Sequence, residues 1–435
     1  MRTVLVLYPG AAGMQRAQVE RHQAWLLEHD LRLALAEHVP NPADAEVYAG
    51  GIVELPPPER LAEAMPVLER WCARHAVDAV LAQSEAGFLA GALLIARLGV
   101  PGPSRDAAHH CTNKYLCRSA LHAAGVAVPR FRLAASAREV AAFAADAGYP
   151  VVLKAVASTM ARLVTVVHDP GAVASAVASM LERLEHAPDV RRLRDFARLA
   201  ALDLGCDPTR QFLVESFSRG QAVEMDGLML DGSARFYGLM EQVLSRPPLF
   251  YIESYLLPAD LGVAEHQSVA AACTGALAAL GLRDSGFSIE MRRGERRAEI
   301  IEVNGRLGQD EAFGDLFQAV CGGDPALHAL ELALGGRPQV HAGNGVRAAL
   351  AYRCHYADAT VTHAPTRAEL EALEVQGLRA GVIAAPGTRT HAPGHPDAYP
   401  HLAWVLAADA HSSCAAHARA ARAAAGLDFR FSGPV

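Results

Sequence analysis

Short apolar runs alternate with helical patterns through the first hundred residues, and this alternation restricts the fold more than any other feature. Strands are expected at 3–8, 51–55 and 78–82, and helices at 15–29, 61–75 and 87–98. Apolar strands separated by helices are typical of a parallel sheet that is covered on both faces. The sequence therefore predicts an N-terminal α/β domain at residues 1–110, closed by the Gly- and Pro-rich segment 99–104.

Composition and charge exclude several classes of protein. The chain has 435 residues, of which 51% are hydrophobic, and a net charge of -7, so it has enough apolar material for several cores and no basic block for nucleic acid. The arginine-rich stretch 191–198 is expected to be a solvated helix face. No apolar run approaches the roughly 20 residues that span a bilayer, so we expect no membrane segment.

The cysteines and the N-terminus indicate the compartment. The eight cysteines are scattered singly, without a C-x-x-C pair or zinc spacing. Such cysteines are typical of reduced thiols in a cytoplasmic protein. The first apolar run is too short for a signal peptide and reads as a buried strand.

A second unit is predicted at 111–340, and a C-terminal α+β region at 341–435. In the second unit Thr112 is expected to cap a helix that carries Lys114, and Lys154 ends a strand. Further strands are expected at 164–168 and 211–215, helices at 171–186, 189–201 and from Asp324 to Gly335, antiparallel strands over 221–252, a hairpin at 286–304 and a last helix at 411–425. The predicted fold class is thus α/β combined with α+β.

The segment 300–306, Ile-Ile-Glu-Val-Asn-Gly-Arg, contains the most informative polar residues. Glu302 and Asn304 share one face of a strand, because alternate residues point the same way. With an odd hairpin loop such as 294–296, Glu290 lies diagonally across from Glu302. Two carboxylates and an amide oxygen suit Mg²⁺ or Mn²⁺ held partly by phosphates, rather than Ca²⁺ or zinc. The alternative is an exposed strand face with unrelated charges.

Several ordered motifs give the chain a family resemblance. They lie at 78–85, 98–102, 113–118, 124–129, 148–154, 212–217, 223–226 and 302–308. In this order they resemble the ATP-grasp enzymes, close to the biotin carboxylase-like carboxylate–amine ligases that include L-amino acid ligases. The resemblance implies a preATP-grasp domain, an ATP-grasp domain with a lid at about 150–215, and a C-terminal region.

The resemblance also implies roles for individual residues. Lys114 and Lys154 would neutralise nucleotide phosphates, although a strand-end lysine that reaches solvent is the alternative for Lys154. The cofactor-binding set further includes the hinge residues Glu215, Ser216 and Phe217 near adenine, and Glu224, which either orients Lys154, reaches the nucleotide or is a plain strand-face carboxylate. Arg306 would stabilise negative charge on an acyl-phosphate.

The loop 155–164 departs from the family pattern because it contains no glycine. Related loops use glycine for backbone freedom and close approach to phosphate. Ser158 and Thr159 hydroxyls and the Arg162 guanidinium are expected to substitute. A weakened ATPase with a degenerate site is the corresponding alternative.

The acceptor side is expected at 245–255 and just after Arg306. Glu253 would meet an amino group, and Tyr251, Tyr255 and Phe250 would flank a side chain; a turn packed with aromatic core residues is the alternative. Gln309 and Asp310 are expected to bind acceptor or metal-bound water. The loop histidines are expected to be solvent-exposed rather than metal ligands: His391, His395 and His401.

The predicted function is an ATP-dependent ligase that joins a small-molecule carboxylate to an amine through an acyl-phosphate. ATP and Mg²⁺ are the expected cofactors, amino acids or related natural-product intermediates the expected substrates, and a homodimer a possible assembly. Two alternatives stay open: a nucleotide-binding regulatory or scaffold protein without turnover, and a bicarbonate-dependent carboxylase.

Overall fold

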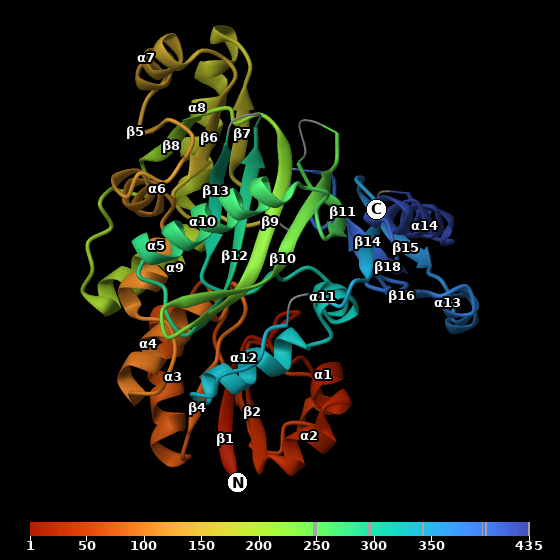
Figure 1. The fold of residues 1–435 in the computed structure, drawn as a ribbon. Helices are drawn as coiled ribbons and strands as arrows, with labels where there is room; N and C mark the ends of the chain where they lie inside the picture. The colour runs from red at the N-terminus through yellow and green to blue at the C-terminus, as the bar shows by residue number, and fades with distance from the viewer. Residues whose placement is uncertain (247–249, 295–296, 342, 394, 396–397, 434–435) are drawn as a thin grey trace.

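A parallel four-stranded sheet forms the N-terminal part of the computed structural model, which describes all residues except 247–249, 295–296, 342, 394, 396–397 and 434–435. Its strands are β1 (Arg2–Leu7), β2 (Leu31–Glu37), β3 (Ile52–Glu54) and β4 (Ala79–Leu81), in the order β3-β2-β1-β4. Alternate β1 residues face two different cores, so helices cover both faces: α3 (Leu61–Arg74) and α4 (Phe88–Leu98) on one, α1 (Arg16–Arg21) and α2 (Gln23–Glu28) on the other (Figure 1). The predicted parallel sheet is confirmed.

Local predictions failed at two helices. The expected helix 15–29 is broken at His22, which separates α1 from α2. Thr112 is not a cap but the last residue of α5 (Arg105–Thr112). The Asn113 side chain caps α6 (Lys114–Ala123) instead, accepting hydrogen bonds from the backbone N–H groups of the first turn.

A smaller antiparallel sheet follows, in the order β5-β8-β6-β7. Its strands are β5 (Phe131–Ala134), β6 (Val151–Ala155), β7 (Val164–Val167) and β8 (Phe212–Ser216). The helices α7 (Ala137–Ala147) and α8 (Val173–Glu185) pack on it around a core of their own, and η2 (Pro170–Ala172) leads into α8. The next helix, α9 (Pro188–Ala200), instead contacts α3, α4 and α5, so it links this sheet to the N-terminal part.

The largest sheet has eight strands in the order β13-β12-β9-β10-β11-β14-β18-β16. Its first five are β9 (Gln221–Leu230), β10 (Ser233–Leu244), β11 (Ile252–Leu257), β12 (Ser285–Arg293) and β13 (Ala298–Asn304). Asp231 and Gly232 both have positive φ in the two-residue β9–β10 turn, as tight hairpins require. The predicted antiparallel pattern and hairpin are confirmed, while Pro247-Pro248, expected to punctuate them, lies outside the described residues.

Helices beside this sheet connect it to the N-terminal part. They are α10 (Val263–Ala279), α11 (Phe313–Cys321) and α12 (Pro325–Ala333), with η1 (Pro42–Glu46) in the N-terminal part. Asp324 caps α12 and Pro325 opens it, as predicted. Residues of α11 and α12 share a core with β1 and β2, so the N-terminal sheet and the large sheet pack through them.

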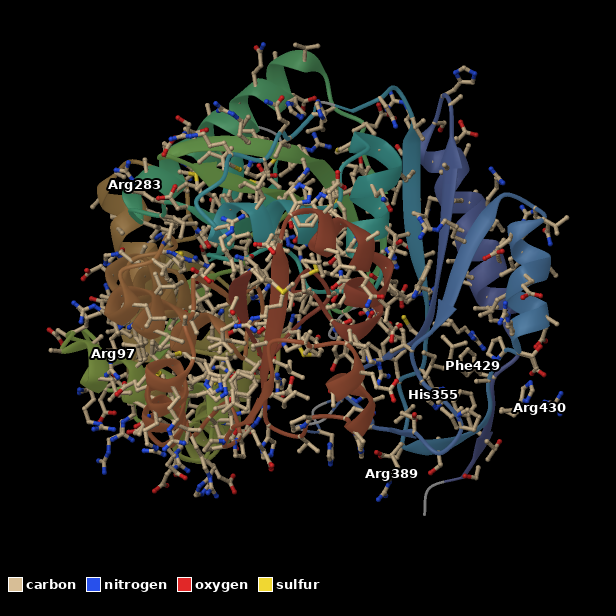
Figure 2. All side chains as sticks on the ribbon, turned by 90° about the horizontal axis from the view of Figure 1, so that it is seen from below. Arg97, Arg283, His355, Arg389, Phe429 and Arg430 are labelled. Atoms are coloured by element: carbon tan, nitrogen blue, oxygen red, sulfur yellow. The ribbon has the colours of Figure 1, made fainter. Side chains whose placement is uncertain are left out.

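The C-terminal part continues the large sheet through β14 (Arg347–Cys354), β18 (His401–Asp409) and β16 (Leu378–Val382). It also contains α13 (Arg367–Glu374), α14 (Ser413–Gly426) and a three-stranded sheet of β15 (Ala359–His363), β17 (Arg389–Thr390) and β19 (Arg430–Ser432). Figure 2 shows this part beside the rest of the molecule, with His355, Phe429 and Arg430 labelled in it. The domain boundaries named above stay predictions. Within the described residues, none of the helices combines the length and the apolar character that crossing a bilayer demands.

Candidate functional site

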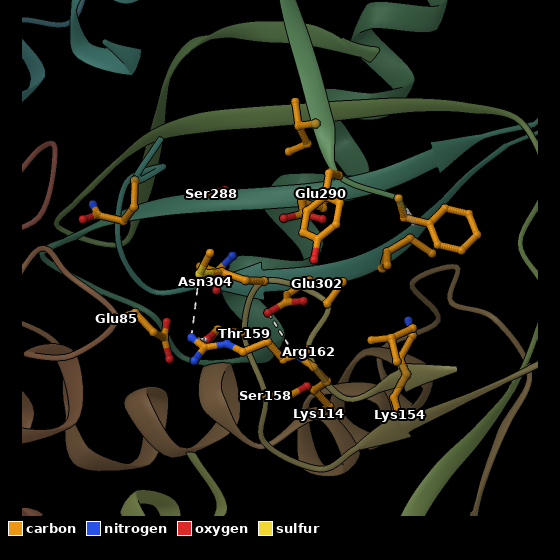
Figure 3. A pocket seen from close by; sticks show the side chains of 18 of the residues that line it. Glu85, Lys114, Lys154, Ser158, Thr159, Arg162, Ser288, Glu290, Glu302 and Asn304 are labelled. Carbon is orange, nitrogen blue, oxygen red and sulfur yellow. Dashed lines mark hydrogen bonds and ion pairs between the residues drawn. The ribbon is translucent and has the colours of Figure 1, made fainter. Parts of the chain in front are cut away.

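One cavity of about 760 Å³ lies between the small sheet and the part of the large sheet formed by β12 and β13. Sixteen of the seventeen predicted site residues line it: Lys114, Lys154, Ser158, Arg162, Glu215, Ser216, Phe217, Glu224, Tyr251, Tyr255, Glu290, Glu302, Asn304, Arg306, Gln309 and Asp310. Carboxylates from β12 and β13 face Lys114 and Lys154 across it (Figure 3). Residues separated by nearly two hundred positions thus share one chemical environment.

The two carboxylates of the predicted metal site face each other directly. Glu290 pairs with Glu302 across the β12–β13 ladder, and the ladder shifts between Glu290 and Met291. The predicted diagonal placement was therefore wrong, because a bulge realigns the strands. Burial raises the pKa of the Glu290 carboxyl to about 8, and the nearby Glu302 carboxylate adds to this shift. A bound cation would relieve that repulsion.

The donor set suits a hard cation with few protein ligands. No group of three His, Cys, Asp or Glu side chains in the described part of the chain is arranged to hold a metal. Glu290, Glu302 and Asn304 supply oxygen atoms only, and they line the cavity together. Mg²⁺ is commonly bound by one or two carboxylates, with substrate phosphates and water completing the octahedron. The residues therefore fit Mg²⁺ or Mn²⁺ in the presence of a phosphate ligand.

Glu215 organises the positive side of the cavity. Its two oxygens contact Arg118 Nε and Lys154 Nζ, each at 2.7 Å. Burial alone would raise the pKa of Glu215, but the Arg118 guanidinium and the Lys154 ammonium outweigh it and lower the pKa to about 2. Glu215, rather than Glu224, thus orients Lys154, and Lys154 is not a strand-end lysine in solvent. Arg118 also donates to the Ile301 carbonyl, which ties this ion pair to β13.

Glu224 belongs to a buried hydrogen-bond network on the large sheet. It accepts from Gln242 Nε2 at 2.7 Å and from the Ser288 hydroxyl at 2.6 Å. Burial, and then the nearby Asp226 carboxylate, raise the pKa of Glu224. Asp226 accepts from the Gly308 backbone N–H at 2.8 Å, so this network anchors the turn that follows Arg306.

Glu85 holds two arginines at one edge of the cavity. Arg306 donates to Glu85 Oε2 through Nε at 3.1 Å and Nη2 at 3.0 Å, and Arg192 Nη2 lies 3.0 Å from Glu85 Oε1. The predicted solvated face of 191–198 was wrong at Arg192, whose exposure is 6%. Helical spacing was the missed signal, because Phe196 and Ala200 follow at four-residue intervals and are also buried.

The glycine-free loop adopts backbone conformations that glycine favours. Met160 and Ala161 both have a φ of 53°, in the left-handed region. Arg162 Nη2 donates to the Thr159 hydroxyl at 3.1 Å, and residues 158–162 all line the cavity. The loop thus reaches the cavity without glycine, at the cost of backbone strain.

Aromatic rings line the end of the cavity beside β8 and β11. Beyond the end of β8 at Ser216, the Phe217 ring lies 6.3 Å from that of Phe250. Tyr255 donates its hydroxyl to Asp310 at 2.8 Å. Glu253 is not among the lining residues; its carboxylate instead accepts from the Tyr356 hydroxyl at 2.7 Å.

Of the three histidines expected in solvent, His395 is exposed, His391 is partly buried and His401 is buried. His401 is buried on β18, stacks on Tyr352 at 3.9 Å and lines the cavity. Its Nε2 lies 2.7 Å from the Ile252 carbonyl. His391 and His395 stack on each other with centroids 3.9 Å apart. His401 was therefore wrongly placed in solvent.

Known proteins share both sequence and fold with this chain. Residues 147–313 match the model of the ATP-grasp domain. The uncharacterized protein y4rH of Sinorhizobium fredii is 28% identical over 233 residues, which cover 53% of this chain and 44% of that protein. The chain thus matches less than half of the length of this relative.

Solved structures cover nearly the whole chain. The L-amino acid ligase from Bacillus licheniformis has a TM-score of 0.78 at 18% identity, covering 100% of this chain and 99% of its own. A carboxyaminoimidazole ribonucleotide synthase from Aspergillus clavatus, complexed with ATP, has a TM-score of 0.70 at 14% identity and covers 96% of both chains. Biotin carboxylase from Campylobacter jejuni has a TM-score of 0.69 at 16% identity, covering 99% of this chain and 92% of its own.

These likenesses agree with the geometry of the cavity. At such identities the solved structures show the fold alone, whereas the family model identifies the ATP-grasp domain. Residues 147–313 therefore match an ATP-grasp domain, and the fold of the chain resembles that of these solved structures.

Proposed function

We propose that this protein is an ATP-dependent carboxylate–amine ligase that forms an amide bond and releases ADP and phosphate. One observation carries the proposal: two lysines, a facing pair of carboxylates and Arg306 converge on a single cavity. Phosphoryl transfer needs positioning and charge stabilisation more than covalent help from the protein. The likeness to an L-amino acid ligase supports this class of reaction.

The nucleotide occupies the end of the cavity next to the small sheet. Lys114 and Lys154 neutralise its phosphates, and the backbone near Ser216 and Phe217 meets the adenine. Glu215 keeps Lys154 directed into the cavity, since the two groups lie 2.7 Å apart and are almost fully buried. Glu290, Glu302 and Asn304 would hold Mg²⁺, which would supply charge neutralisation at the phosphates.

Arg306 acts where the carboxylate is activated. An oxygen of the substrate carboxylate takes the terminal phosphoryl group of ATP, and ADP leaves. The amine then attacks the carbonyl carbon of the acyl-phosphate, phosphate leaves, and the amine loses a proton. The Arg306 guanidinium stabilises the negative charge on the acyl-phosphate and on the tetrahedral species that follows, an electrostatic contribution on the order of 10²–10³ in rate.

The acceptor binds in the part of the cavity beside β11 and Asp310, whereas the adenine lies beside β8. Tyr251 and Tyr255 supply apolar ring surface there, and Asp310 supplies a negative charge for an ammonium group. Gln309 lies next to Asp310 in the same lining. Asp310 takes the role that was expected for Glu253. Glu253 does not line the cavity, and its carboxylate accepts a hydrogen bond from Tyr356. This end suits an amino acid with an apolar or aromatic side chain.

A product screen tests the ligase. The full-length protein is incubated with MgATP and paired carboxylates and amines, phosphate release is measured, and products are identified by mass spectrometry. Phosphate release that requires both partners and yields an amide supports the proposal. Turnover that requires bicarbonate and no amine would identify a carboxylase instead. MgATP binding without turnover on any pair would identify a regulatory protein.

Two further expectations belong to this proposal. Each of the eight cysteines is a free thiol, in keeping with a reducing compartment such as the cytoplasm. A homodimer is expected by likeness to the family, and light scattering after size exclusion measures it.

A further inference from the structure

We propose that Arg192, together with Ser158, binds the terminal phosphoryl group of ATP beside Arg306. This inference rests on the proposed function only in that the cavity takes ATP. It assigns part of the phosphate contact to a helix outside the glycine-free loop, namely α9.

Two buried hydrogen-bond donors in the lining of the cavity have no acceptor within the protein. Arg192 Nε and the Ser158 hydroxyl are both buried and make no hydrogen bond within the protein. The two residues are each 6% exposed and line the same cavity. A buried polar group without a hydrogen bond is destabilising, so such groups call for a ligand or an ordered water. A phosphoryl group offers three strong acceptor oxygens, which match these donors.

Positive and negative side chains both line a small pocket beside Arg192. This pocket of about 10 Å³ shares its lining with the cavity at Arg192, Ser158, Lys114, Arg306 and Asn304, and the carboxylates of Glu85, Asp189 and Glu302 also line it. Asn304 and Glu302 belong to the set that would hold Mg²⁺, which would neutralise negative charge on the phosphates. A phosphoryl group between Asn304 and Arg306 would therefore also lie beside Arg192, because all three residues line this pocket.

Glu85 and Asp189 fix the direction of the Arg192 guanidinium. Arg192 Nη2 lies 3.0 Å from Glu85 Oε1 and 3.0 Å from Asp189 Oδ1, whereas the Nε–H on the same edge of the guanidinium makes no hydrogen bond. Glu85 holds Arg306 by its second oxygen. One carboxylate thus sets the spacing of the two arginines, which a pair of independent surface side chains would not keep.

Because the loop 155–164 lacks glycine, phosphate contacts from another element would compensate for it. Met160 and Ala161 stand in left-handed conformations without glycine, so this backbone has little freedom to fold over a phosphate. Arginine presents a planar fork that matches phosphate oxygens. Arg192 supplies from a rigid helix the donors that a glycine-rich loop would supply from its backbone.

The competing explanation is that Arg192 only joins α9 to the segment after β4 through Glu85. A purely structural ion pair of this kind affects folding stability but does not change the relative affinity for ATP and ADP. The two explanations differ in whether the loss depends on the terminal phosphate.

Nucleotide binding to the full-length protein separates them. Calorimetry measures Kd for MgADP and for a non-hydrolysable MgATP analogue in the wild type, Arg192→Gln and Arg192→Lys, without carboxylate or amine. We expect Arg192→Gln to weaken the analogue about 10- to 100-fold and MgADP less than about twofold, since a hydrogen bond to a charged group contributes about 1.5–3 kcal/mol. Arg192→Lys, which keeps the charge, should recover part of the loss.

Arg191→Gln is the matched control. Arg191 neighbours Arg192 on α9, its side chain is 56% exposed, and it does not line the cavity. This variant should bind both nucleotides as the wild type does. If Arg192→Gln does not fold, as judged by circular dichroism, Ser158→Ala carries the test and should weaken the analogue about 5- to 10-fold.

Equal losses for both nucleotides, or no loss for either, would overturn the inference while leaving the ligase proposal intact. A wild type that binds neither nucleotide would overturn both. A wild type that binds both and shows the selective loss, but forms no amide in the product screen, would retain the inference and reject the ligase.

Discussion

The ammonium of Lys114 lies 2.8 Å from Glu302 Oε1, so a proposed phosphate ligand and a proposed metal ligand are paired with each other. The Lys114 side chain is almost buried, and the Glu302 side chain is three-quarters covered. A cation at Glu302 competes with Lys114, and a phosphate offers Lys114 a new partner. In the proposed ligase, nucleotide and metal would replace this contact by one from Lys114 to phosphate and one from Glu302 to the cation.

Replacing Glu302 by glutamine should reduce turnover far more than stability. Glutamine keeps the volume and an oxygen acceptor for Lys114 but removes the charge that Mg²⁺ needs. We expect kcat to fall by about 100-fold or more, as for other electrostatic contacts of this kind, with a small change in Tm. Glu299→Gln, on the same strand outside the cavity lining, is the control. A large drop in Tm without a specific loss of turnover would contradict the metal role.

Nucleotide and metal should stabilise the fold jointly. A ligand at 100 times its Kd stabilises the native state by about 2.7 kcal/mol. We expect Tm to rise with ATP plus Mg²⁺ and to return most of the way when EDTA is added, because the facing Glu290 and Glu302 carboxylates repel each other without the cation. An equal Tm rise in ATP with and without EDTA would exclude a metal at this pair.

Glu215→Gln should destabilise the protein in a pH-dependent manner. The folded pKa of Glu215 is about 2, below its unfolded value of about 4.3, so its contribution is complete above pH 4.3 and is lost as pH falls toward 2. Near pH 7 the variant should lose about 3–5 kcal/mol, since Arg118 stays buried without its carboxylate.

The measurement is urea unfolding of both proteins between pH 7 and pH 2.5. The difference in free energy of unfolding between the wild type and Glu215→Gln should become smaller toward the lowest pH. Glu371→Gln, which removes an exposed i,i+4 ion pair with Arg367, should change stability by less than about 0.5 kcal/mol. A gap that widens on acidification would reverse the assigned sign.

Ala161→Gly should be neutral or stabilising, against the usual cost of glycine. Alanine at a φ of 53° carries strain on the order of 1–2 kcal/mol, which glycine relieves, while its extra chain entropy costs about 0.5–1 kcal/mol. Ala161 is exposed, so no packing is lost. Ala135→Gly, at an exposed alanine without positive φ, should be neutral or destabilising. Equal destabilisation by both substitutions, measured by urea unfolding, would contradict the strain.

Asp310→Asn should weaken the amine substrate selectively. The change keeps the shape and an acceptor for the Tyr255 hydroxyl but removes the negative charge at the aromatic end. We expect KM for the amine to rise about tenfold or more, with nucleotide Kd nearly unchanged, because a paired ammonium loses a charge-assisted contact. Initial rates at varied amine measure KM, and calorimetry measures Kd. A parallel rise in nucleotide Kd would place Asp310 at the nucleotide instead.

Local sequence patterns were sufficient for the strands that carry the site. The alternation at 3–8 and 78–82 predicted the parallel sheet, and the two-residue periodicity predicted that Glu302 and Asn304 share a face. Both properties depend on neighbours along the chain. Strand register is different, because the bulge beside Glu290 arises from pairing with β13 and could not be read from either strand alone.

The sequence by itself determined the fold class, the strand that carries Glu302 and Asn304, and the order of the site segments. Tertiary structure decided how these residues are oriented. Glu85 and Arg306 are 221 positions apart, Arg118 and Glu215 are 97 apart, and neither pairing has a local signature. Buried charges take partners from whichever element lies nearest, since leaving them unpaired costs several kcal/mol. For this reason Arg192, which was expected on a solvated helix face, is paired with Glu85 at the edge of the cavity.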